Sequence, residues 1–449
     1  MSARSKKTMR VPYALSVHGK EEIDAVVRVL RSNTALGEKT KEFENKIAAL
    51  FGKKYGCMVN SGSSANLLAF ELLNLPKGSE VITPLLTFST VVAPIVQKGL
   101  VPVFCDVDPR TFQIDIDQLE KAITKKTRAL MIPSLMGNIP DLPRLSKIAQ
   151  KHKLYLIEDS CDTLGGTIDG KPTGAYSDIS VTSFYGSHII NGAGGGGMIC
   201  VNKPEWADRL VVLRGWGRRS SLFGEKADSE QLKNRFRSTI GGIPYDEKFV
   251  FSEIGYNFLP LELSAAFALE QLKKLPHFLE ARKKNWIQFQ QFFNTHDGFF
   301  NTAIQTPKTA TAWLAFPVII KQGTLFDRST IVKYLEEHGI QTRPVFTGNI
   351  LKQPGFERVP HRAPFGNYEN TENIMRNAFV LGCHQGLSSQ QIEYVQRTVS
   401  EFLSQYEKAL KALNALRAAG KILGIPLASL IESFTNSDAS TPRKHAMRF

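Results

Sequence analysis

Three short stretches of this sequence combine ligand-binding side chains with small residues, and the first is Asn60-Ser-Gly-Ser-Ser-Ala-Asn66. It runs into the apolar residues 67–73, so a turn of small residues opens a helix. The free N–H groups of such a helix start, together with its dipole, can bind a phosphate. Gly62, Ser63 and Ser64 are therefore candidate phosphate-binding residues. A plain N-capped helix accounts for the same residues equally well.

The second stretch is Leu156-Ile-Glu-Asp-Ser-Cys-Asp162, in which an apolar run ends in carboxylates. Open α/β sheets bind ligands at the ends of buried parallel strands, so Asp159 could pair with a protonated ring nitrogen of a cofactor. Glu158 and Asp162 are its acidic neighbours. The alternative is that these carboxylates cap the following helix.

The third stretch is Ser183-Phe-Tyr-Gly-Ser-His188, which is followed by a glycine-rich segment that ends at Gly197. Glycines between two strand-like segments permit the backbone to approach a ligand closely. A lone histidine is usually structural, but His188 precedes glycines whose ordering costs entropy. Together the three stretches provide a phosphate site, an acidic partner for a ring nitrogen and a base. This set predicts pyridoxal phosphate (PLP), which enzymes normally also hold through a Schiff-base lysine.

Short apolar segments alternate with helical patterns through roughly residues 50–250. The predicted strands are residues 80–83, 101–105, 129–132, 154–157, 179–184 and 197–201. Between them, residues 141–152 place apolar side chains at three- and four-residue steps, as an amphipathic helix does. Buried strands that alternate with helices predict an α/β domain with a mostly parallel sheet.

The second half of the chain predicts a smaller α+β domain. The expected elements are a long helix over 261–293 with a break near Pro276, a half-exposed strand over 313–320, and helices over 330–338 and 390–416. Four regions are therefore predicted: a basic N-terminal arm (1–12), a large domain (13–250), a long helix with the smaller domain (251–416), and a partly disordered tail (417–449).

The composition excludes several classes of protein. The chain has 449 residues, of which 42% are hydrophobic, and a net charge of +14. No basic helix or aromatic–basic module accompanies this charge, so nucleic acid is not an expected partner. Five scattered cysteines predict reduced thiols in a cytoplasmic protein that has no metal site. No apolar run is long enough for a membrane span, and the basic start lacks the apolar segment of a signal peptide.

Six motifs in a fixed order give the sequence a resemblance to a known family. They are residues 60–65 and 83–88, Val103-Phe-Cys-Asp-Val-Asp108, residues 158–162, Ser183-Phe-Tyr185 and residues 255–266. Through these motifs the chain resembles the DegT/StrS-type sugar-nucleotide aminotransferases and dehydratases over residues 13–404. The resemblance implies the aspartate-aminotransferase-like fold of type I PLP enzymes. That α/β fold has a large domain with a mostly parallel sheet and a smaller C-terminal α+β domain.

The resemblance is closest to one branch of this family. Its aminotransferases carry the Schiff-base lysine five residues after the motif serine, here Ser183, and that position is His188, as in the family's 3-dehydratases. Those enzymes act on GDP- or CDP-linked 4-keto-6-deoxyhexoses. The CDP-sugar enzymes hold a [2Fe–2S] cluster on four cysteines, whereas residues 215–245 contain no cysteine. We therefore expect no cluster and no iron–sulfur reductase partner.

The resemblance implies removal of the hydroxyl from carbon 3 of a nucleotide-linked 4-keto-6-deoxyhexose. Because imidazole forms no stable Schiff base, the cofactor is expected to stay as non-covalently bound pyridoxamine phosphate (PMP), which L-glutamate regenerates. His188, with an ordinary pKa near ~6.5, would take one proton and return it to the leaving hydroxyl. The 3-deoxy product would serve synthesis of the lipopolysaccharide O-antigen or a related glycan.

The resemblance also implies roles for single residues around the cofactor. The residues expected at its phosphate are Gly62, Ser63, Ser64 and Ser183. The ring is expected to stack on Phe88, to pair its nitrogen with Asp159 and to meet Asp162 at its hydroxyl.

Three further residues are assigned by the same resemblance. Asn257 is expected to reach the cofactor phosphate of the neighbouring subunit, which implies a homodimer. Arg343 and Asn349, from the marker Arg343-Pro-Val-Phe-Thr-Gly-Asn349, are expected to meet the sugar or glutamate.

One departure from the family pattern keeps an alternative open. The pattern after the active residue ends in Gly-Glu-Gly-Gly, which falls on Ala193-Gly-Gly-Gly196, so Gly194 replaces the acidic residue. The alternative is an enzyme that resembles nucleotide-sugar aminotransferases, or a catalytically altered, regulatory family member.

Overall fold

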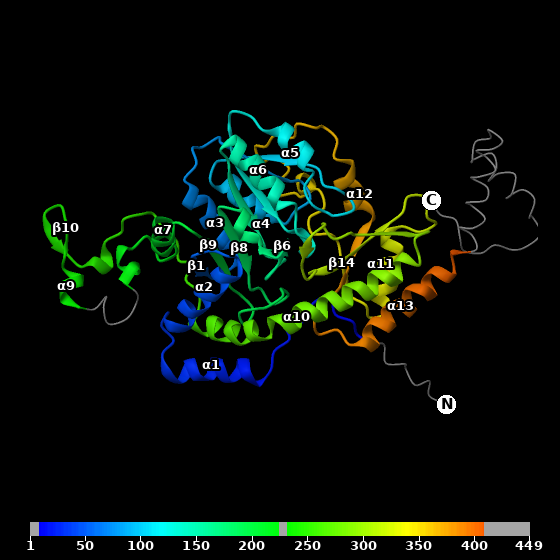
Figure 1. Ribbon diagram of the computed structural model, residues 1–449, viewed down its shortest axis with the longest axis horizontal. Helices are drawn as coiled ribbons and strands as arrows, with labels where there is room; N and C mark the ends of the chain where they lie inside the picture. The colour runs from blue at the N-terminus through cyan, green and yellow to red at the C-terminus, as the bar shows by residue number, and fades with distance from the viewer. Residues whose placement is uncertain (1–8, 224–230, 408–449) are drawn as a thin grey trace, which may run out of the picture.

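The computed structural model describes residues 9–223 and 231–407. Figure 1 shows two domains joined by one long helix, with an arm that projects from the larger domain. The predicted tail over 417–449, and most of the predicted N-terminal arm, lie outside the described residues. Among the described residues, no helix is both long enough and apolar enough to cross a bilayer.

A seven-stranded sheet forms the centre of the larger domain. Its strands are β1 (Tyr55–Val59), β2 (Glu80–Pro84), β3 (Val101–Cys105), β4 (Thr127–Pro133), β5 (Tyr155–Asp159), β8 (Ile179–Ser183) and β9 (Gly197–Val201). Their order is β1-β9-β8-β5-β4-β2-β3, and only β9 runs antiparallel to its neighbours. The predicted, mostly parallel sheet is therefore confirmed.

Helices cover both faces of this sheet because apolar side chains point alternately to the two faces along each strand. In β1, Cys57 and Val59 lie in one apolar cluster, whereas Met58 lies in another, with Phe43 and Ala265. The first cluster is closed mainly by α3 (Gly62–Leu73), α4 (Ser89–Gln97) and α7 (Pro204–Arg214). The opposite face is closed by α2 (Glu38–Leu50), α5 (Ile116–Ala122), α6 (Leu142–His152) and α10 (Glu262–Asn294).

Helix α10 connects the two domains and packs on α1 (Lys20–Ser32). The predicted break near Pro276 is wrong, because the helix continues through this residue. Proline removes one backbone hydrogen bond and crowds the preceding turn. Here Leu275 and Phe278, on either side of it, are buried in the core, and this packing holds the helix together.

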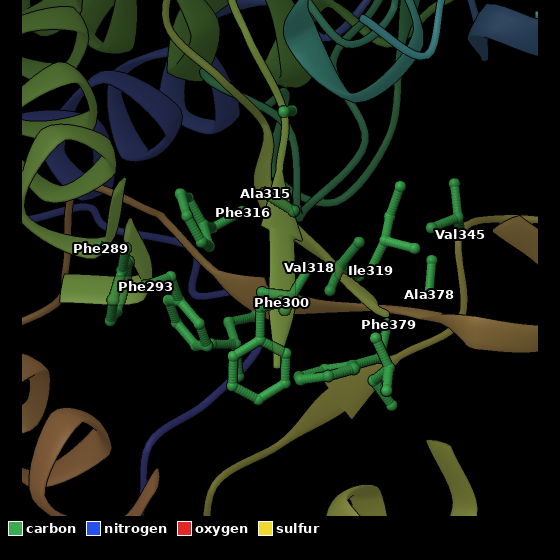
Figure 2. Packing of buried hydrophobic residues seen from close by; sticks show 14 of the residues in the cluster. Phe289, Phe293, Phe300, Ala315, Phe316, Val318, Ile319, Val345, Ala378 and Phe379 are labelled. Atoms are coloured by element: carbon green, nitrogen blue, oxygen red, sulfur yellow. The ribbon is translucent and has the colours of Figure 1, made fainter. Parts of the chain in front are cut away.

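The smaller domain contains a four-stranded antiparallel sheet of order β12-β14-β16-β15. Its strands are β12 (Phe300–Thr302), β14 (Ala315–Ile320), β15 (Thr342–Arg343) and β16 (Ala378–Gly382), and its helices are α11 (Arg328–Glu337), α12 (Glu369–Asn377) and α13 (Ser389–Ser404). The half-exposed strand expected over 313–320 is wrong, because every residue of β14 is buried. Figure 2 shows the reason: Phe316 points toward Phe289 and Phe293 of α10, while Ile319 lies on the other side near Val345.

Shorter elements complete the chain. A three-stranded sheet joins β6 (Thr167–Ile168) to β7 (Lys171–Pro172) and β13 (Thr309–Ala310). The 3₁₀ turns are η1 (Leu135–Gly137), η2 (Thr173–Tyr176), η3 (Arg219–Phe223), η4 (Glu247–Phe249) and η5 (Ile350–Lys352). The arm, residues 216–223 and 231–258, holds α9 (Leu232–Arg235), β10 (Ser238–Ile240) and β11 (Ile243–Tyr245), and Figure 1 shows it extending beyond α7.

Candidate active site

Four strands of the large sheet bring the predicted stretches to one edge. Strands β2, β5 and β8 run in the same direction, and β1 joins them because β1 and β8 are both antiparallel to β9. Gly62 follows β1, Asp159 ends β5, Ser183 ends β8 and Phe88 follows β2. All four residues therefore lie at the carboxyl edge, where open α/β sheets bind ligands.

Gly62 closes the predicted phosphate site against the end of β8. A Cβ atom at this position would lie 2.7 Å from the Cβ of Ser183 and 3.0 Å from the Sγ of Cys161. These distances leave no room for a side chain, so only glycine allows the start of α3 to approach β8 this closely. The first turn of the helix and Ser183 thus form one cradle.

The first turn of α3 is also capped, as the alternative interpretation expected. The Oγ of Ser61 accepts a hydrogen bond from the backbone N–H of Ser64 at 3.1 Å and lies 3.0 Å from its Oγ. Ser63 is exposed, in the first turn of this helix. Because one cap satisfies only part of the first turn, a capped helix can still present N–H groups to a phosphate.

Asp159 is held rigidly at the end of β5 and is 5% exposed. Its Oδ2 accepts a hydrogen bond from Nδ2 of Asn66 at 2.8 Å, and its Oδ1 accepts one from the backbone N–H of Cys161 at 3.0 Å. Beside it, Ser134 donates its backbone N–H to the Asp159 carbonyl, but its buried Oγ has no partner among the described residues. A buried carboxylate beside an unsatisfied hydroxyl fits a polar aromatic ligand such as the PLP ring.

Asp162 is buried and does not cap a helix, since the next element is β6. Its Oδ2 accepts a hydrogen bond from the backbone N–H of Met136 at 3.0 Å. Burial, together with the nearby charge of Asp159, raises the pKa of Asp162 to about 8. Asp162 can therefore carry a proton at neutral pH and donate it in a hydrogen bond.

His188 lies in the irregular segment that follows β8. Its Nδ1 atom is 3.3 Å from the carbonyl oxygen of Ser183. Since a carbonyl only accepts, Nδ1 must carry the proton in this contact, which leaves Nε2 as the basic nitrogen. Burial lowers the pKa of His188 to about 4, so the ring is neutral and able to accept a proton at neutral pH.

The small domain supplies the predicted substrate residues. The Phe346 ring meets Phe88 edge-on, with ring centroids 5.7 Å apart. The guanidinium of Arg343, an exposed residue, lies 5.5 Å from the ring of Tyr13. Asn349 is 8% exposed and is occupied inside the protein, because its Nδ2 donates to Glu372 at 2.6 Å. Contact of Arg343 and Asn349 with a substrate stays a prediction.

Residues 17–400 match the model of the DegT/DnrJ/EryC1/StrS aminotransferase family. The chain belongs to this family. It is 36% identical over 406 residues to the lipopolysaccharide biosynthesis protein RfbH of Salmonella typhimurium, covering 88% of this chain and 92% of that protein. It is 34% identical over 398 residues to GDP-4-keto-6-deoxy-D-mannose 3-dehydratase of Yersinia pseudotuberculosis, covering 86% and 98%.

The family fold is also found in a solved structure. Crystalline GDP-4-keto-6-deoxymannose-3-dehydratase with a trapped PLP–glutamate geminal diamine superposes with a TM-score of 0.78 at 32% identity. The match covers 87% of this chain and 100% of that enzyme. The family resemblance and the PLP-enzyme fold predicted from the sequence are confirmed.

Asn257 lies where the arm returns to the large domain, since the carbonyl of the next residue, Phe258, accepts a hydrogen bond from the backbone N–H of Asn60 at 3.0 Å. Asn257 is exposed in the arm, where its backbone pairs with Gly215 at the end of α7. Its expected contact with the cofactor therefore stays a prediction that requires a second subunit.

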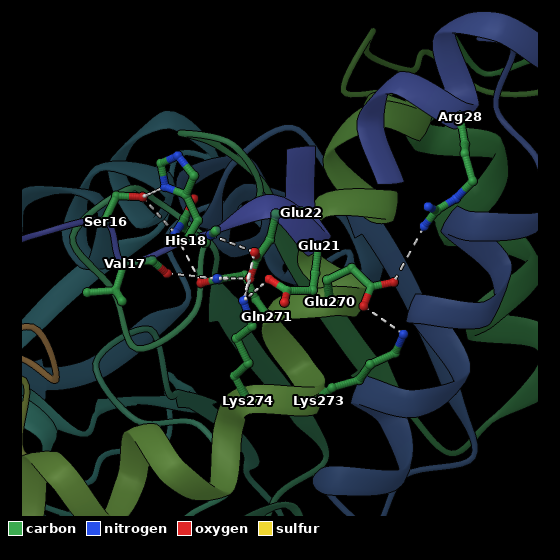
Figure 3. A network of polar contacts seen from close by, with 12 residues as sticks. Ser16, Val17, His18, Glu21, Glu22, Arg28, Glu270, Gln271, Lys273 and Lys274 are labelled. Atoms are coloured by element: carbon green, nitrogen blue, oxygen red, sulfur yellow. Dashed lines mark hydrogen bonds and ion pairs between the residues drawn. The ribbon is translucent and has the colours of Figure 1, made fainter. Parts of the chain in front are cut away.

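Some side chains near the site come from distant segments and are not predicted by the sequence. Burial and the nearby charge of Asp162 raise the pKa of Tyr13, in the N-terminal segment, to about 12, while the charge of Arg282 lowers it. Figure 3 shows how this segment is fastened to α10: Nε2 of Gln271 donates to the Val17 carbonyl at 2.9 Å and to Glu22 at 2.7 Å. No local pattern signals Tyr13 or Arg282. By contrast, Asn66 lies within the first motif and could have been assigned.

Proposed function

We propose that this chain is a PLP-dependent 3-dehydratase that removes the carbon 3 hydroxyl of a nucleotide-linked 4-keto-6-deoxyhexose. One observation carries the proposal: His188, not lysine, lies five residues after Ser183, the residue packed against Gly62. The similarity to proteins named 3-dehydratases supports the same reaction. The similarity to RfbH supports a place in lipopolysaccharide O-antigen or related glycan synthesis.

The residues at the carboxyl edge fit the cofactor. Gly62, Ser63, Ser64 and Ser183 would hold its phosphate, and the buried carboxylate of Asp159 would hold its ring nitrogen in the protonated form. Asp162 would donate its proton toward the ring hydroxyl, and Phe88 would cover the ring face. When bound as PMP, the cofactor supplies an amine for the sugar ketone and a ring that accepts electrons.

His188 performs the proton transfers in this proposal. The Ser183 carbonyl holds its Nδ1–H, so Nε2 is the atom that takes a proton. The same nitrogen can then return the proton to the hydroxyl that leaves carbon 3. A lysine at this position would tether the cofactor instead. L-Glutamate is the proposed donor that restores the amine, as the glutamate adduct in the solved relative suggests.

We further propose a homodimer whose two arms complete the two sites. The arm exposes large apolar side chains to solvent, and Ile254 is 97% exposed. Others are Leu232, Ile243, Phe249 and Phe251. Apolar surface on this scale marks a protein interface. A second copy that covers it would bring Asn257 to the partner's cofactor. The five free cysteines and the sugar-nucleotide substrate favour the cytoplasm as the site of action.

The test is incubation of the purified protein with PMP, glutamate and a panel of 4-keto-6-deoxyhexoses linked to GDP, CDP or dTDP. The proposal expects a 3-deoxy product, ammonia and 2-oxoglutarate in equal amounts with one nucleotide. Formation of an amino sugar without ammonia would show an aminotransferase. No reaction with any of these sugars would contradict the proposed activity.

A further inference from the structure

The loop that carries His188 is fastened to the small domain through one side chain. Nε2 of Gln385, in the segment after β16, donates a hydrogen bond to the carbonyl of Ile189 at 3.2 Å. Ile189 directly follows His188 and is 2% exposed. Among the described residues, no other group donates a hydrogen bond to this carbonyl. Gln385 is thus positioned to set the place of the imidazole.

Arg282 determines which way the Gln385 amide points. The Nε of Arg282 donates to Oε1 of Gln385 at 2.7 Å. A guanidinium has only donors, so the amide oxygen must face Arg282 and the amide nitrogen must face Ile189. Arg282 is itself fully buried and fixed, because its Nη1 donates to the carbonyls of Trp313 and Leu314 at 3.2 and 3.1 Å.

The rest of the loop has little regular structure of its own. Its backbone bonds run from the N–H of His188 to the Tyr185 carbonyl and from that of Gly192 to the Phe184 carbonyl, both at 2.9 Å. At the far end of the loop, Nδ2 of Asn191 donates to Oε1 of Gln271 on α10 at 3.3 Å and to Oγ of Ser16 at 3.1 Å. None of these bonds connects the loop to the small domain. The bond from Gln385 does so, and it lies beside the residue whose position decides proton transfer.

We infer that Gln385 is a positioning residue for His188, held in its active orientation by Arg282. Its two hydrogen bonds join α10, the small domain and the catalytic loop. The inference rests on the proposed function for its effect on turnover, but its effect on the loop is independent of any reaction.

The test separates this role from a contribution to folding. Gln385→Glu keeps an oxygen for Arg282 and strengthens that contact through charge, but it loses the donor to Ile189. The variant should unfold at the same or higher denaturant concentration than the parent. In the cofactor-free protein, hydrogen exchange in residues 184–192 should become faster. With cofactor, kcat should fall about tenfold to a hundredfold while KM for the sugar nucleotide stays the same, because an ångström-scale displacement of a catalytic group costs about that factor.

Gln396→Glu is the matched control. Gln396, on α13, likewise donates to one backbone carbonyl, that of Gln288 on α10, at 3.5 Å. It should leave exchange in 184–192 and kcat at the parent's values. If Gln385→Glu gives the control's exchange pattern, the inference is wrong, whatever happens to kcat. Should that variant fail to fold, Gln385→Met, which loses both bonds at similar length, is judged by the same exchange measurement. Parent protein that turns over no sugar nucleotide would overturn the proposed function while leaving the exchange result to decide this inference.

Discussion

The Nδ1 atom of His188 lies 3.3 Å from the carbonyl oxygen of Ser183, the last residue of β8. Ser183 therefore contributes to the candidate site through both its side chain and its backbone. Its side chain faces the cradle formed with Gly62, and its backbone directs the imidazole proton away from Nε2. The five-residue spacing between Ser183 and His188 thus sets which ring nitrogen of His188 carries the proton.

The lowered pKa of His188 predicts the pH dependence of turnover. A base with a pKa of about 4 stays unprotonated from pH 7 down to 5.5, so kcat/KM should be flat over this range. A histidine with an ordinary pKa near ~6.5 would instead lose about tenfold in activity at pH 5.5. Initial rates in buffers of constant ionic strength distinguish the two. A decline with a midpoint near ~6.5 would argue against a desolvated imidazole.

His384 predicts how stability depends on pH. It is 1% exposed, its Nε2 donates to the Pro12 carbonyl at 3.0 Å, and burial lowers its pKa to about 4. Because the folded protein resists protonation here, stability should decrease as pH falls from about 6.5 toward 4, by up to about 1.4 kcal/mol per pH unit. Urea unfolding between pH 7 and 5 should show a shallower slope for His384→Gln than for the parent. Equal slopes would contradict the assignment.

Gly62→Ala should damage the phosphate cradle. The new methyl group would lie 2.7 Å from Ser183 Cβ, and such overpacking costs about 1–3 kcal/mol of stability. It should also push α3 away from β8 and weaken PMP binding, measured by fluorescence titration. Gly355→Ala is the matched control, because its Cβ meets nothing within 4 Å. An unaltered PMP affinity in Gly62→Ala would remove this residue from the cradle.

Mixed subunits test whether Asn257 acts across a dimer. Asp159→Ala should abolish cofactor retention and turnover if its carboxylate, oriented by Asn66, holds the ring nitrogen as proposed. Asn257→Ala should do the same from the partner. Equal mixing of the two inactive proteins after unfolding and refolding should restore about a quarter of the parent activity, because half of the dimers then contain one intact site. If no activity returns, Asn257 acts within its own subunit; if Asn257→Ala alone keeps the parent's activity, Asn257 has no part in the site.

The sequence allowed the large sheet and the convergence of three motifs to be predicted for one physical reason. Buried parallel strands are short apolar runs, and their carboxyl ends meet at one edge, so Gly62, Asp159 and Ser183 had to lie together. Contacts between distant segments were out of reach. Gln385 lies almost two hundred residues after Ile189, and no local periodicity indicates that pairing. The strand β14 was misjudged because its second face is covered by side chains such as Val345, which comes from another part of the chain.

The proposed reaction requires a cofactor that is held without a covalent bond at residue 188. The most direct measurement is the intact mass of the PLP-loaded protein after borohydride reduction, with His188→Lys as the positive control. We expect the unmodified mass for the parent and a phosphopyridoxyl adduct for His188→Lys, which should also lose dehydration. A reduced adduct on any lysine of the parent protein would contradict this expectation.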